Sequence, residues 1–509
     1  MVDGAWPAGG RALCTATGGQ SSPTIVSDGA GGAIVSWSDG RLGSNSDIYA
    51  QHVLASGAVD PSWPADGRAL CTATGAQFNQ TSVSDGAGGA IVTWQDSRGT
   101  TNYDIYAQRV LASGAVDPAW PANGRAICTA IAQQVLPIII ADGAGGAIIT
   151  WYDHRNLITD HVYAQHVLIT GAVDAAWPAD GRELLPTGGN QQSPTLVGDG
   201  AGGAIVTWTN NAGGGATTTD VYAQHVLSTG AVDPAWPAAS LAVCSAASNQ
   251  VSPTIVTDGA AGAIVTWYDQ RNNATSGRDI YAQHVLSSGA VDPAWPVNGR
   301  ALCTATGDQY LPAMLTDGMG GAFVTWQDLR DDATQSYDVY AHHVLSSGAV
   351  DGAWPANGRG VCTAGGLQGV PAIVTDGSGG IIVGWEDHRG ADFDIYALEL
   401  DPFGNIVAVT PGSRPERFDL LSPFPNPARN DRVTIRFDLP VAQPVSAEVL
   451  DVAGHRVRTL ALDRQLTAGR QSLAWDGRDG AGALLTSGVY FICVRTGANA
   501  DMRRIVMLR

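Results

Sequence analysis

The stretch SPTIVTDGAAGAIVTWYDQRNNATSGRDIYAQHVLSSGAVDPAWPVNGR, residues Ser252 to Arg300, is one copy of a unit that the chain contains seven times. Two tryptophans mark each copy. The first series is Trp37, Trp94, Trp151, Trp208, Trp267, Trp326 and Trp385, and the second is Trp6, Trp63, Trp120, Trp177, Trp236, Trp295 and Trp354. Both series advance by 57, 57, 57, 59, 59 and 59 residues. A fixed period indicates one repeated architecture, because each unit buries its apolar surface against its neighbours.

Turn residues divide each unit into four segments of strand character, which we name a to d in chain order. In the first copy strand a is residues 22–27, strand b is AIVSW at 33–37, strand c is 47–54, and the segment 63–73 supplies strand d. Runs such as AIVTW are apolar at consecutive positions, so both faces of the sheet should be buried. Seven units of four short antiparallel strands predict an all-β fold, a seven-bladed β-propeller. A parallel β-helix uses shorter rungs, and immunoglobulin-like repeats need about 100 residues each.

The phase of the repeat predicts how the ring closes. The chain begins inside a unit, so a free strand d precedes the first strand a. We expect Ala12 to Thr17 to complete the last blade by pairing beside Asp394 to Leu400. A competing fourth strand is present at Asn405 to Val409.

Charge is uneven along the chain, whose net charge is −19. Residues 1–413 carry 14 Arg against 37 acidic residues, whereas residues 414–509 carry 14 Arg against 10. An acidic repeat region repels phosphate backbones, so nucleic acid is not an expected partner. No segment has the roughly 18 uninterrupted apolar residues of a membrane span. The N-terminal MVDGAWPAGG shows neither the basic start nor the apolar core of a secretory signal.

Six of the seven cysteines occupy one position of the repeat. They are Cys14, Cys71, Cys128, Cys244, Cys303 and Cys362, with Leu185 in the fourth copy. Equivalent positions of successive repeats should lie farther apart than the roughly 4.4 to 6.8 Å between Cα atoms that a disulfide allows. We therefore interpret these cysteines as small buried side chains rather than disulfides or metal ligands.

The last part of the chain has a different pattern. Residues 411–417 have the composition of a linker, and from 432 to 439 apolar and polar residues alternate as in a half-buried strand. Three further motifs follow in order: Asp451 through Gly454 to Val457, Trp475-Asp476-Gly477-Arg478-Asp479, and Ser487-Gly488-Val489-Tyr490. With Pro425-Asn426-Pro427 before them and the basic apolar end Arg504 to Arg509 after them, these motifs resemble the FlgD-type immunoglobulin-like domain.

The FlgD-type domain is related to the C-terminal sorting domains of type IX secretion in bacterial surface proteins. The resemblance implies a seven-stranded sandwich and, for sorting members, export followed by release or surface anchoring. Ala428 stands where an aromatic residue is common, and Arg replaces Lys near the end. The predicted organisation is thus a propeller at 1–410, a linker at 411–417 and an Ig-like domain at 418–509.

An Asp and an Arg two residues apart follow strand b in six copies. The motif is WSDGR at Trp37, WQDSR at Trp94, WYDHR at Trp151, WYDQR at Trp267, WQDLR at Trp326 and WEDHR at Trp385. Facing the Asp that opens strand c, these groups are expected to form a charge network that holds the b–c loop. The alternative is that they bind sugar hydroxyls. In that case the candidate binding residues are Asp153, His154, Arg155, Asp387, His388 and Arg389.

Histidine and glycine motifs give weaker signals. A His beside an Asp, as at His154 and His388, is a candidate general base or metal ligand, with His161 nearby, but no second ligand set has metal spacing. His52, His166, His225, His284 and His343 share one strand c position and are interpreted as packing or rim residues. The DGAGG motif precedes no helix and lacks alternating oxygen ligands, so it is interpreted as a turn. We expect no catalytic residue, metal or cofactor.

The copies differ most in the b–c loop. In a four-stranded meander the b–c and d–a loops emerge on one face, so variation collects there, and loops on a rigid scaffold commonly bind ligands. We expect the binding site at this face and at the mouth of the central channel. The candidate contacts there are Tyr103, Asn273, Asp331 and Tyr337.

An enzyme usually needs one asymmetric set of reacting groups, whereas near-identical copies present similar groups several times. The sequence therefore favours a non-enzymatic binding or scaffold protein, secreted or on the cell surface, whose propeller recognises a glycan or a protein and whose C-terminal domain engages secretion or anchoring machinery. The first alternative is a carbohydrate-active hydrolase or lyase with its site at the channel mouth, in which two carboxylates converge. The second is a purely structural spacer. A cytoplasmic location stays open as well.

Overall fold

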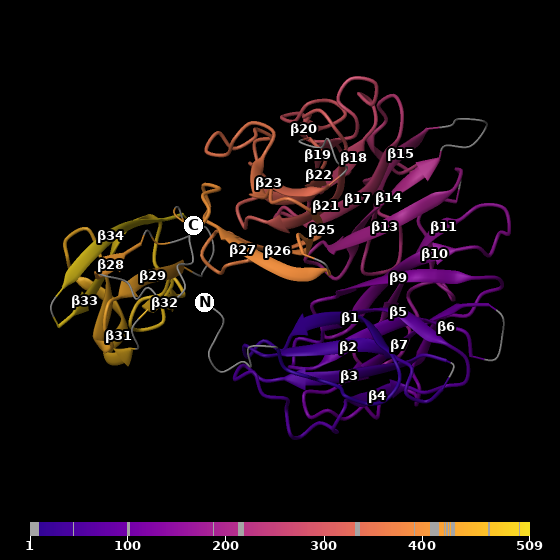
Figure 1. Ribbon diagram of the computed structural model, residues 1–509, viewed down its shortest axis with the longest axis horizontal. Helices are drawn as coiled ribbons and strands as arrows, with labels where there is room; N and C mark the ends of the chain where they lie inside the picture. Colours follow the sequence, from indigo (N-terminus) through magenta and orange to yellow (C-terminus); the bar gives the residue numbers. More distant parts are fainter. Residues whose placement is uncertain are drawn as a thin grey trace. The chain divides into compact units, whose positions relative to one another are not determined.

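The computed structural model describes residues 10–43, 45–98, 102–186, 188–211, 218–330, 336–390, 392–407, 417–421, 423, 426, 428, 433–466, 469–497 and 499–508. Within these ranges every regular element is a β-strand (Figure 1). In the same ranges no helix is long and apolar enough to cross a membrane. The chain divides into two compact units, one of residues 2–372 and 385–396 and the other mainly of residues 373–384 and 397–509.

Six four-stranded antiparallel sheets follow one another along the chain. The first holds β1 (Gln20–Ser27), β2 (Ala33–Asp39), β3 (Asp47–Val53) and β4 (Arg68–Cys71), and the second β5 (Gln77–Ser84), β6 (Ala90–Asp96), β7 (Asp104–Val110) and β8 (Arg125–Cys128). The third holds β9 (Gln134–Ala141), β10 (Ala147–Asp153), β11 (His161–Val167) and β12 (Arg182–Glu183), and the fourth β13 (Gln191–Gly198), β14 (Ala204–Asn211), β15 (Thr219–Val226) and β16 (Leu241–Cys244). The fifth holds β17 (Gln250–Thr257), β18 (Ala263–Asp269), β19 (Asp279–Val285) and β20 (Arg300–Cys303), and the sixth β21 (Gln309–Thr316), β22 (Ala322–Asp328), β23 (Asp338–Val344) and β24 (Arg359–Cys362).

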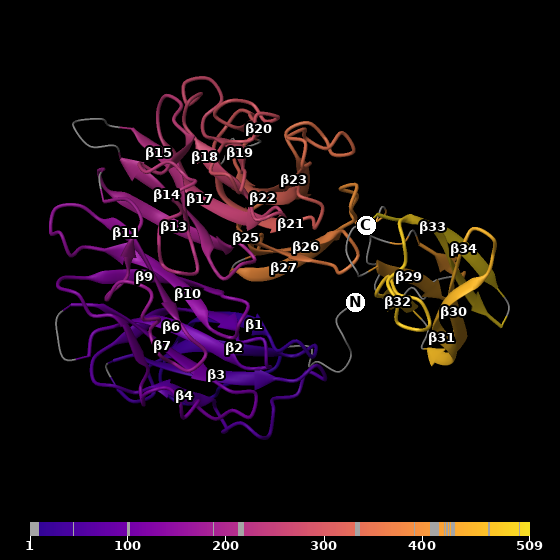
Figure 2. The same ribbon diagram turned by 180° about the vertical axis from the view of Figure 1, so that it is seen from behind.

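The seventh sheet has three strands, β25 (Leu367–Thr375), β26 (Ile381–His388) and β27 (Asp394–Leu400). The first strands of the six preceding sheets are neighbours in the order β1, β5, β9, β13, β17 and β21, so these sheets are arranged around a common axis, as both ribbon views show (Figures 1 and 2). This arrangement and the seven sheets confirm the predicted seven-bladed propeller. Each first strand contains an irregularity in its pairing, as between Ser21 and Thr24 of β1.

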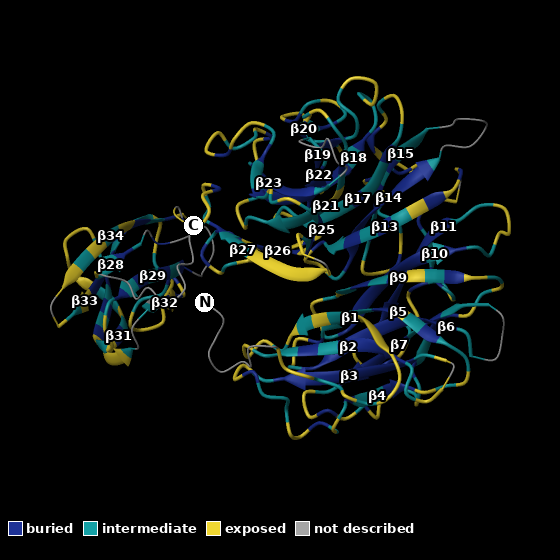
Figure 3. Ribbon diagram, viewed as in Figure 1, coloured by how far each residue is buried: buried dark blue, intermediate teal, exposed yellow. Residues whose placement is uncertain are grey.

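The core lies between successive sheets because the middle strands are buried on both faces. The two middle strands of the second sheet contribute Ile91, Trp94 and Ile105, each 0% exposed. Figure 3 shows the same pattern in the middle strands of the other four-stranded sheets of the repeat, whereas in the seventh sheet β26 is buried only at alternate positions and β27 is largely exposed. The indole of Trp94 leaves no room for a side chain at Gly124, where a Cβ atom would lie 2.7 Å from the ring. The consecutive apolar residues of AIVTW therefore serve two interfaces, as predicted.

The predicted closure of the ring is wrong for the described residues. Ala12 to Thr17 forms no strand, and β27 pairs with β26 alone. The backbone N–H of Thr15 instead donates to Asp66 at 2.6 Å, as that of Thr72 does to Asn123 at 3.0 Å. The segment thus keeps the lateral contacts of a strand d but not its sheet pairing. Of the competing strand at 405–409, the described part makes one isolated bridge, between Leu400 and Ile406.

The C-terminal part is a sandwich of two sheets. One has the order β28 (Asp419–Leu420), β29 (Val433–Leu439), β32 (Gly469–Trp475), and the other the order β31 (Arg456–Leu466), β30 (Gln443–Leu450), β33 (Gly488–Thr496), β34 (Ala500–Met507). Its seven strands confirm the predicted Ig-like sandwich. The boundaries at 410 and 418 stay predictions, because the linker residues 411–416 lie outside the described residues.

The sequence motifs of the sandwich have structural roles. The indole of Trp475 packs edge-on against Tyr490, with ring centroids 6.1 Å apart, and its N–H donates to the carbonyl of Arg478 at 2.9 Å. The carboxylate of Asp451 accepts two backbone N–H groups of the turn that follows it. The amide of Asn426 exchanges hydrogen bonds with the backbone of β34. These motifs therefore fix the core, a turn and the last strand.

Candidate functional site

In the copies that contain it, the Asp–Arg motif joins a sheet to the segment of chain that ends the preceding unit. In the second sheet the guanidinium of Arg98 donates to Asp96 through Nε at 2.9 Å and through a terminal nitrogen at 2.5 Å. The same terminal nitrogen reaches the carbonyl of Asn123 at 2.6 Å and the sulfur of Cys71, at the end of the first sheet, at 3.3 Å. The guanidinium carbon of Arg98 lies over the ring of Tyr106, 3.7 Å from the ring centroid. The motif is an inter-sheet clamp, and the cysteine is one of its acceptors.

Four of the sequence-predicted binding residues belong to this clamp. Asp153 and Asp387 are 1% and 0% exposed and accept from Trp151 and Trp385 respectively. Arg155 and Arg389 donate to them in the same way as Arg98 does to Asp96. The described contacts therefore account for these side chains without a ligand.

The Asp that opens strand c was expected to join the clamp, and this expectation is wrong. The Cα atoms of Asp39 and Asp47 are paired across β2 and β3, but Arg41 bonds only the first of these carboxylates. Burial and the neighbouring carboxylate raise the pKa of Asp47 to about 6. For Asp39, burial opposes ionisation, but hydrogen bonds from Arg41 and Trp37 outweigh it and lower its pKa to about 2. Two facing carboxylates thus differ strongly in acidity.

The repeated strand c histidines bridge two aspartates. In the fifth sheet Nε2 of His284 lies 2.9 Å from Asp258 and Nδ1 lies 2.8 Å from Asp292. Burial alone would lower the pKa of His284, but the two carboxylates outweigh it and raise the pKa. In the second sheet Arg109 makes the equivalent contacts to Asp85 and Asp117. The position therefore holds a basic side chain that bridges the a–b turn and the c–d connection.

The third sheet departs from the repeat at four positions that carry acid–base groups. Nδ1 of His154 lies 2.5 Å from Asp160, and their side chains are 38% and 21% exposed. Nδ1 of His161 lies 2.5 Å from Glu183, while its Nε2 lies 2.9 Å from the hydroxyl of Thr159. Because 159, 160 and 161 are consecutive, the two imidazole–carboxylate pairs adjoin each other.

A hollow of about 380 Å³ lies beside these groups. Its lining includes His154, Thr159 and Asp160 from the third sheet and Asn102 and Gln133 from the neighbouring loops. The backbone N–H of His154 donates to the backbone carbonyl of Gln133 at 2.9 Å, which fixes the backbone beside the hollow. Two acid–base groups therefore border a space large enough for part of a ligand.

Sequence reasoning singled out His154 and noted His161 nearby, but it missed Asp160 and Glu183. The signal was available: His161 replaces the Asp that opens strand c in most copies, and Glu183 replaces the Ala of the RAL segments. Each substitution, taken alone, looks like an ordinary difference between copies of the repeat. The register that pairs β11 with β12 brings the two together.

The mouth of the central channel lacks the expected carboxylates. The hollow there measures about 550 Å³ and is lined by the first strands of six sheets. Prolines from five of these strands take part: Pro23, Pro137, Pro194, Pro253 and Pro312. Among the described residues that line it, only Tyr152 carries a titratable side chain. A pair of carboxylates for acid–base chemistry is therefore absent from this lining.

Of the remaining sequence-predicted residues, Tyr103 adjoins the third sheet, where its carbonyl accepts the backbone N–H of Gln134 at 2.7 Å, whereas Asn273, Tyr337 and His388 belong to the fifth, sixth and seventh sheets. Tyr103 packs edge-on against Phe78 at 5.3 Å, and Tyr337 against Tyr310 at 5.7 Å. His388 stacks on Phe393 at 4.6 Å. Asn273 lines a separate hollow of about 390 Å³ in the fifth sheet. Asp331 lies outside the described residues.

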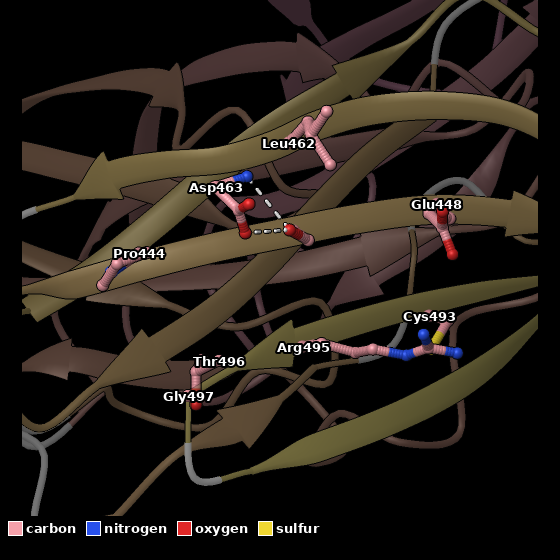
Figure 4. A pocket seen from close by; sticks show the side chains of 9 residues that line it. Pro444, Glu448, Leu462, Asp463, Cys493, Arg495, Thr496 and Gly497 are labelled. Atoms are coloured by element: carbon pink, nitrogen blue, oxygen red, sulfur yellow. Dashed lines mark hydrogen bonds between the residues drawn. The ribbon is translucent and has the colours of Figure 1, made fainter.

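The sandwich carries a hollow of about 680 Å³ on the face of β30, β31 and β33 (Figure 4). Its lining includes Glu448, Asp463, Cys493 and Arg495. Ser446 and Asp463 bond each other across the two strands. No imidazole lines this hollow among the described residues, and in those residues no group of three or more His, Cys, Asp and Glu side chains is placed to hold a metal ion.

Residues 428–500 match the FlgD Ig-like domain family, in agreement with the resemblance of the sequence motifs. No curated protein is significantly similar to the chain. Solved structures that are similar include an α-L-arabinanase of Penicillium chrysogenum complexed with arabinobiose, at 12% identity and a TM-score of 0.35, covering 67% of this chain and 93% of that one.

Two further structures are a polysaccharide lyase, Uly1, at 10% identity and a TM-score of 0.36, covering 75% of this chain and 87% of that one, and an endo-arabinase of Bacteroides thetaiotaomicron, at 11% identity and a TM-score of 0.31, covering 51% and 92%. These similar structures are enzymes, which contradicts the predicted non-enzymatic binding protein. The carbohydrate-active alternative agrees better with them. At these identities and TM-scores, the groups that could react must be identified from the side chains of this chain.

Proposed function

We propose that the propeller is a carbohydrate-active enzyme that cleaves a polysaccharide at the third sheet. The observation that carries the proposal is the adjacent pair of imidazole–carboxylate contacts, His154–Asp160 and His161–Glu183, beside a hollow. Most other copies have Asp at the position of His161 and Ala at that of Glu183, and the position of His154 is a histidine again in the seventh copy, His388.

His154 is the proposed general base. Its Nδ1 lies 2.5 Å from Asp160, and in a neutral ring that carries its proton on Nδ1 the Nε2 atom is unprotonated and can take a proton from an attacking water. Within the described residues Nε2 has no hydrogen-bond partner, and the ring borders the hollow. A departing sugar oxygen needs a proton in return. His161 can deliver one through the hydroxyl of Thr159, which also borders the hollow.

Charge favours hydrolysis of a neutral polysaccharide. The repeat region carries 37 acidic residues against 14 arginines, so it repels an anionic chain. Cleavage by elimination requires a sugar carboxylate that acidifies the neighbouring C–H, and such a substrate is anionic. Hydrolysis has no such requirement.

The test is the release of reducing ends from arabinan, xylan and cellulose. His154→Asn should lower the rate at least about 100-fold, the usual contribution of a positioned general base. His455→Asn is the matched control, because His455 also contacts a carboxylate, that of Asp451 at 3.3 Å, but lies in the sandwich. Full activity in a folded His154→Asn variant would refute the role of the base. An unsaturated product would indicate elimination instead.

The C-terminal domain is proposed to direct export or surface attachment through secretion machinery. The family match at 428–500 supports this role. In a bacterium with type IX secretion, a fluorescent protein carrying residues 418–509 and an export signal should reach the cell surface or medium. If the fusion stays in the periplasm while the sandwich is folded, the export role is refuted and the domain is a structural part of the enzyme.

A further inference from the structure

An aromatic cluster lies between the fifth and sixth sheets, away from the acid–base groups of the third. The rings of Tyr268 and Tyr310 are 5.8 Å apart, and those of Tyr310 and Tyr337 are 5.7 Å apart. The guanidinium of Arg278 lies 4.5 Å from the centre of the Tyr310 ring and 5.7 Å from that of Tyr268. All four side chains are partly exposed. We name this group, with Asp308, the tyrosine cluster.

The tyrosine cluster is specific to this position of the repeat. The position of Tyr310 is occupied in the first five sheets by Ser21, Phe78, Val135, Gln192 and Val251, as the pairings of the first two strands show. In the second sheet Phe78 meets Tyr103, but no arginine lies over either ring among the described residues. Packing of the blades therefore does not require three tyrosines and an arginine.

Asp308 fixes the polar side of the tyrosine cluster. One carboxylate oxygen accepts the backbone N–H of Arg278 at 2.9 Å, and the other accepts the hydroxyl of Tyr310 at 2.6 Å. The Tyr310 side chain and the backbone at Arg278 are thereby held in place without a ligand. A prearranged site loses little conformational entropy on binding.

A hollow adjoins the tyrosine cluster. It measures about 390 Å³ and is lined by residues 273–277, Gly307, Asp308 and Leu329. Asp308 belongs to both. Concave sites that combine aromatic surface with a few fixed polar groups are typical of ligand binding. The hollow itself offers the carboxylate of Asp308 and the exposed amide side chain of Asn273, while the tyrosine rings and the Arg278 guanidinium belong to the cluster beside it.

We infer that the tyrosine cluster and its hollow bind a sugar residue of a neutral polysaccharide. The tyrosine rings offer flat apolar surfaces for the C–H face of a sugar ring, while Asp308 and Arg278 match hydroxyl donors and acceptors. Since the site contains opposite charges and stands in an acidic region, an uncharged ligand fits it best. The inference rests on the proposed function for the choice of ligand class. Its role is to hold the polymer, separately from the reacting groups.

The experiment measures binding in proteins that also carry His154→Asn, so that the polymer is not consumed. Affinities for arabinan, xylan and cellulose are compared with that for polygalacturonate. Tyr310→Ala should weaken binding to the preferred neutral polymer about tenfold, the effect of losing one ring contact. Tyr310→Phe keeps the ring and should bind nearly as tightly as the parent. Phe78→Ala, at the equivalent position of the second sheet, is the matched control for packing.

The outcomes separate this inference from the proposed function. Unchanged affinity in folded Tyr310→Ala, equal losses in Tyr310→Ala and Phe78→Ala, or binding of polygalacturonate alone would each overturn the inference, even if the enzyme cleaves neutral polymers. Tyr310-dependent binding without any cleavage would support the inference and refute the proposed enzyme. A melting curve for each variant shows that it is folded.

Discussion

Replacing Asp47 by Asn should stabilise the propeller at neutral pH. The carboxyl is 5% exposed and faces Asp39, which the clamp keeps ionised. Because the pKa of Asp47 rises from 3.8 to about 6, its ionisation above pH 6 opposes folding. One pKa unit corresponds to about 1.4 kcal/mol, so the cost is at most about 3 kcal/mol and about 1–3 kcal/mol after solvent screening. Asparagine has the same shape and no charge.

The sign of the pH dependence follows from proton binding. Between about pH 4 and 6 the folded protein binds the proton of Asp47 more tightly than the unfolded chain does, so stability falls as the pH rises through this window. The pKa of Asp104, at the equivalent position of the second sheet, is also raised to about 6 by burial and by Asp96. A double variant, Asp47→Asn with Asp104→Asn, should therefore gain about 2–6 kcal/mol at pH 8.

The assay is thermal unfolding of the parent and the double variant at pH 8 and pH 4. For about 400 residues an unfolding entropy of roughly 2.1 cal/mol/K per residue gives about 1 °C per kcal/mol. We expect the melting temperature to rise by about 2–6 °C at pH 8 and to differ little at pH 4. Asp39→Asn is the control and should destabilise, because it removes the acceptor of Trp37 and Arg41. Equal melting temperatures at pH 8, or a gain that persists undiminished at pH 4, would refute the reasoning.

Three further predictions concern the scaffold. Gly124→Ala should destabilise by about 1–3 kcal/mol more than Gly86→Ala, because both glycines have positive φ but only Gly124 faces an indole; equal urea midpoints would contradict this. Trp151→Phe should cost about 1 kcal/mol more than Trp208→Phe, because the Trp151 N–H donates to Asp153 whereas that of Trp208 has no partner in the described residues. Differential scanning calorimetry of the two variants checks this difference. His284→Arg should remove the pH dependence of this bridge, because arginine stays charged: the stability that the raised pKa of His284 supplies is present below pH 6.5 and is lost as the pH rises through that pKa, so the parent should lose stability relative to the variant as the pH rises above 6.5 in denaturant titrations, and parallel curves would count against it.

The sequence predicted the sheets well because one signal repeats. Each AIVTW run is apolar at consecutive positions, and the spacing of the tryptophans gives seven units. The glycine turn was also interpreted correctly: Asp258 accepts the backbone N–H groups of Ala260 and Gly262. These features depend on residues that are close together in the sequence, so they can be predicted from one sequence alone. The C-terminal domain was identified for a different reason, several motifs in a fixed order.

Contacts between sheets were not predicted, because they join residues far apart in the sequence. The sulfur of Cys71 meets Arg98 of the following sheet, so a residue interpreted as a small buried side chain is part of a clamp. The bridging of Asp258 and Asp292 by His284 spans 26 and 8 residues. Ring closure failed for a related reason: the repeat phase indicates which segment is available, whereas pairing depends on its position beside β27.

The repeat also explains where a reacting group is to be sought in this chain. At a position filled alike in most sheets, the side chain serves packing, as Asp153 does in the clamp. A group that can react must therefore stand where one copy departs from the others. His161 and Glu183 depart together, and their contact with each other shows that the two departures form one arrangement rather than two separate surface changes. Restoring the common residues, His161→Asp with Glu183→Ala, should accordingly keep the blade folded while removing any cleavage that passes protons through Thr159. Loss of the fold in this double variant would instead assign the pair to packing.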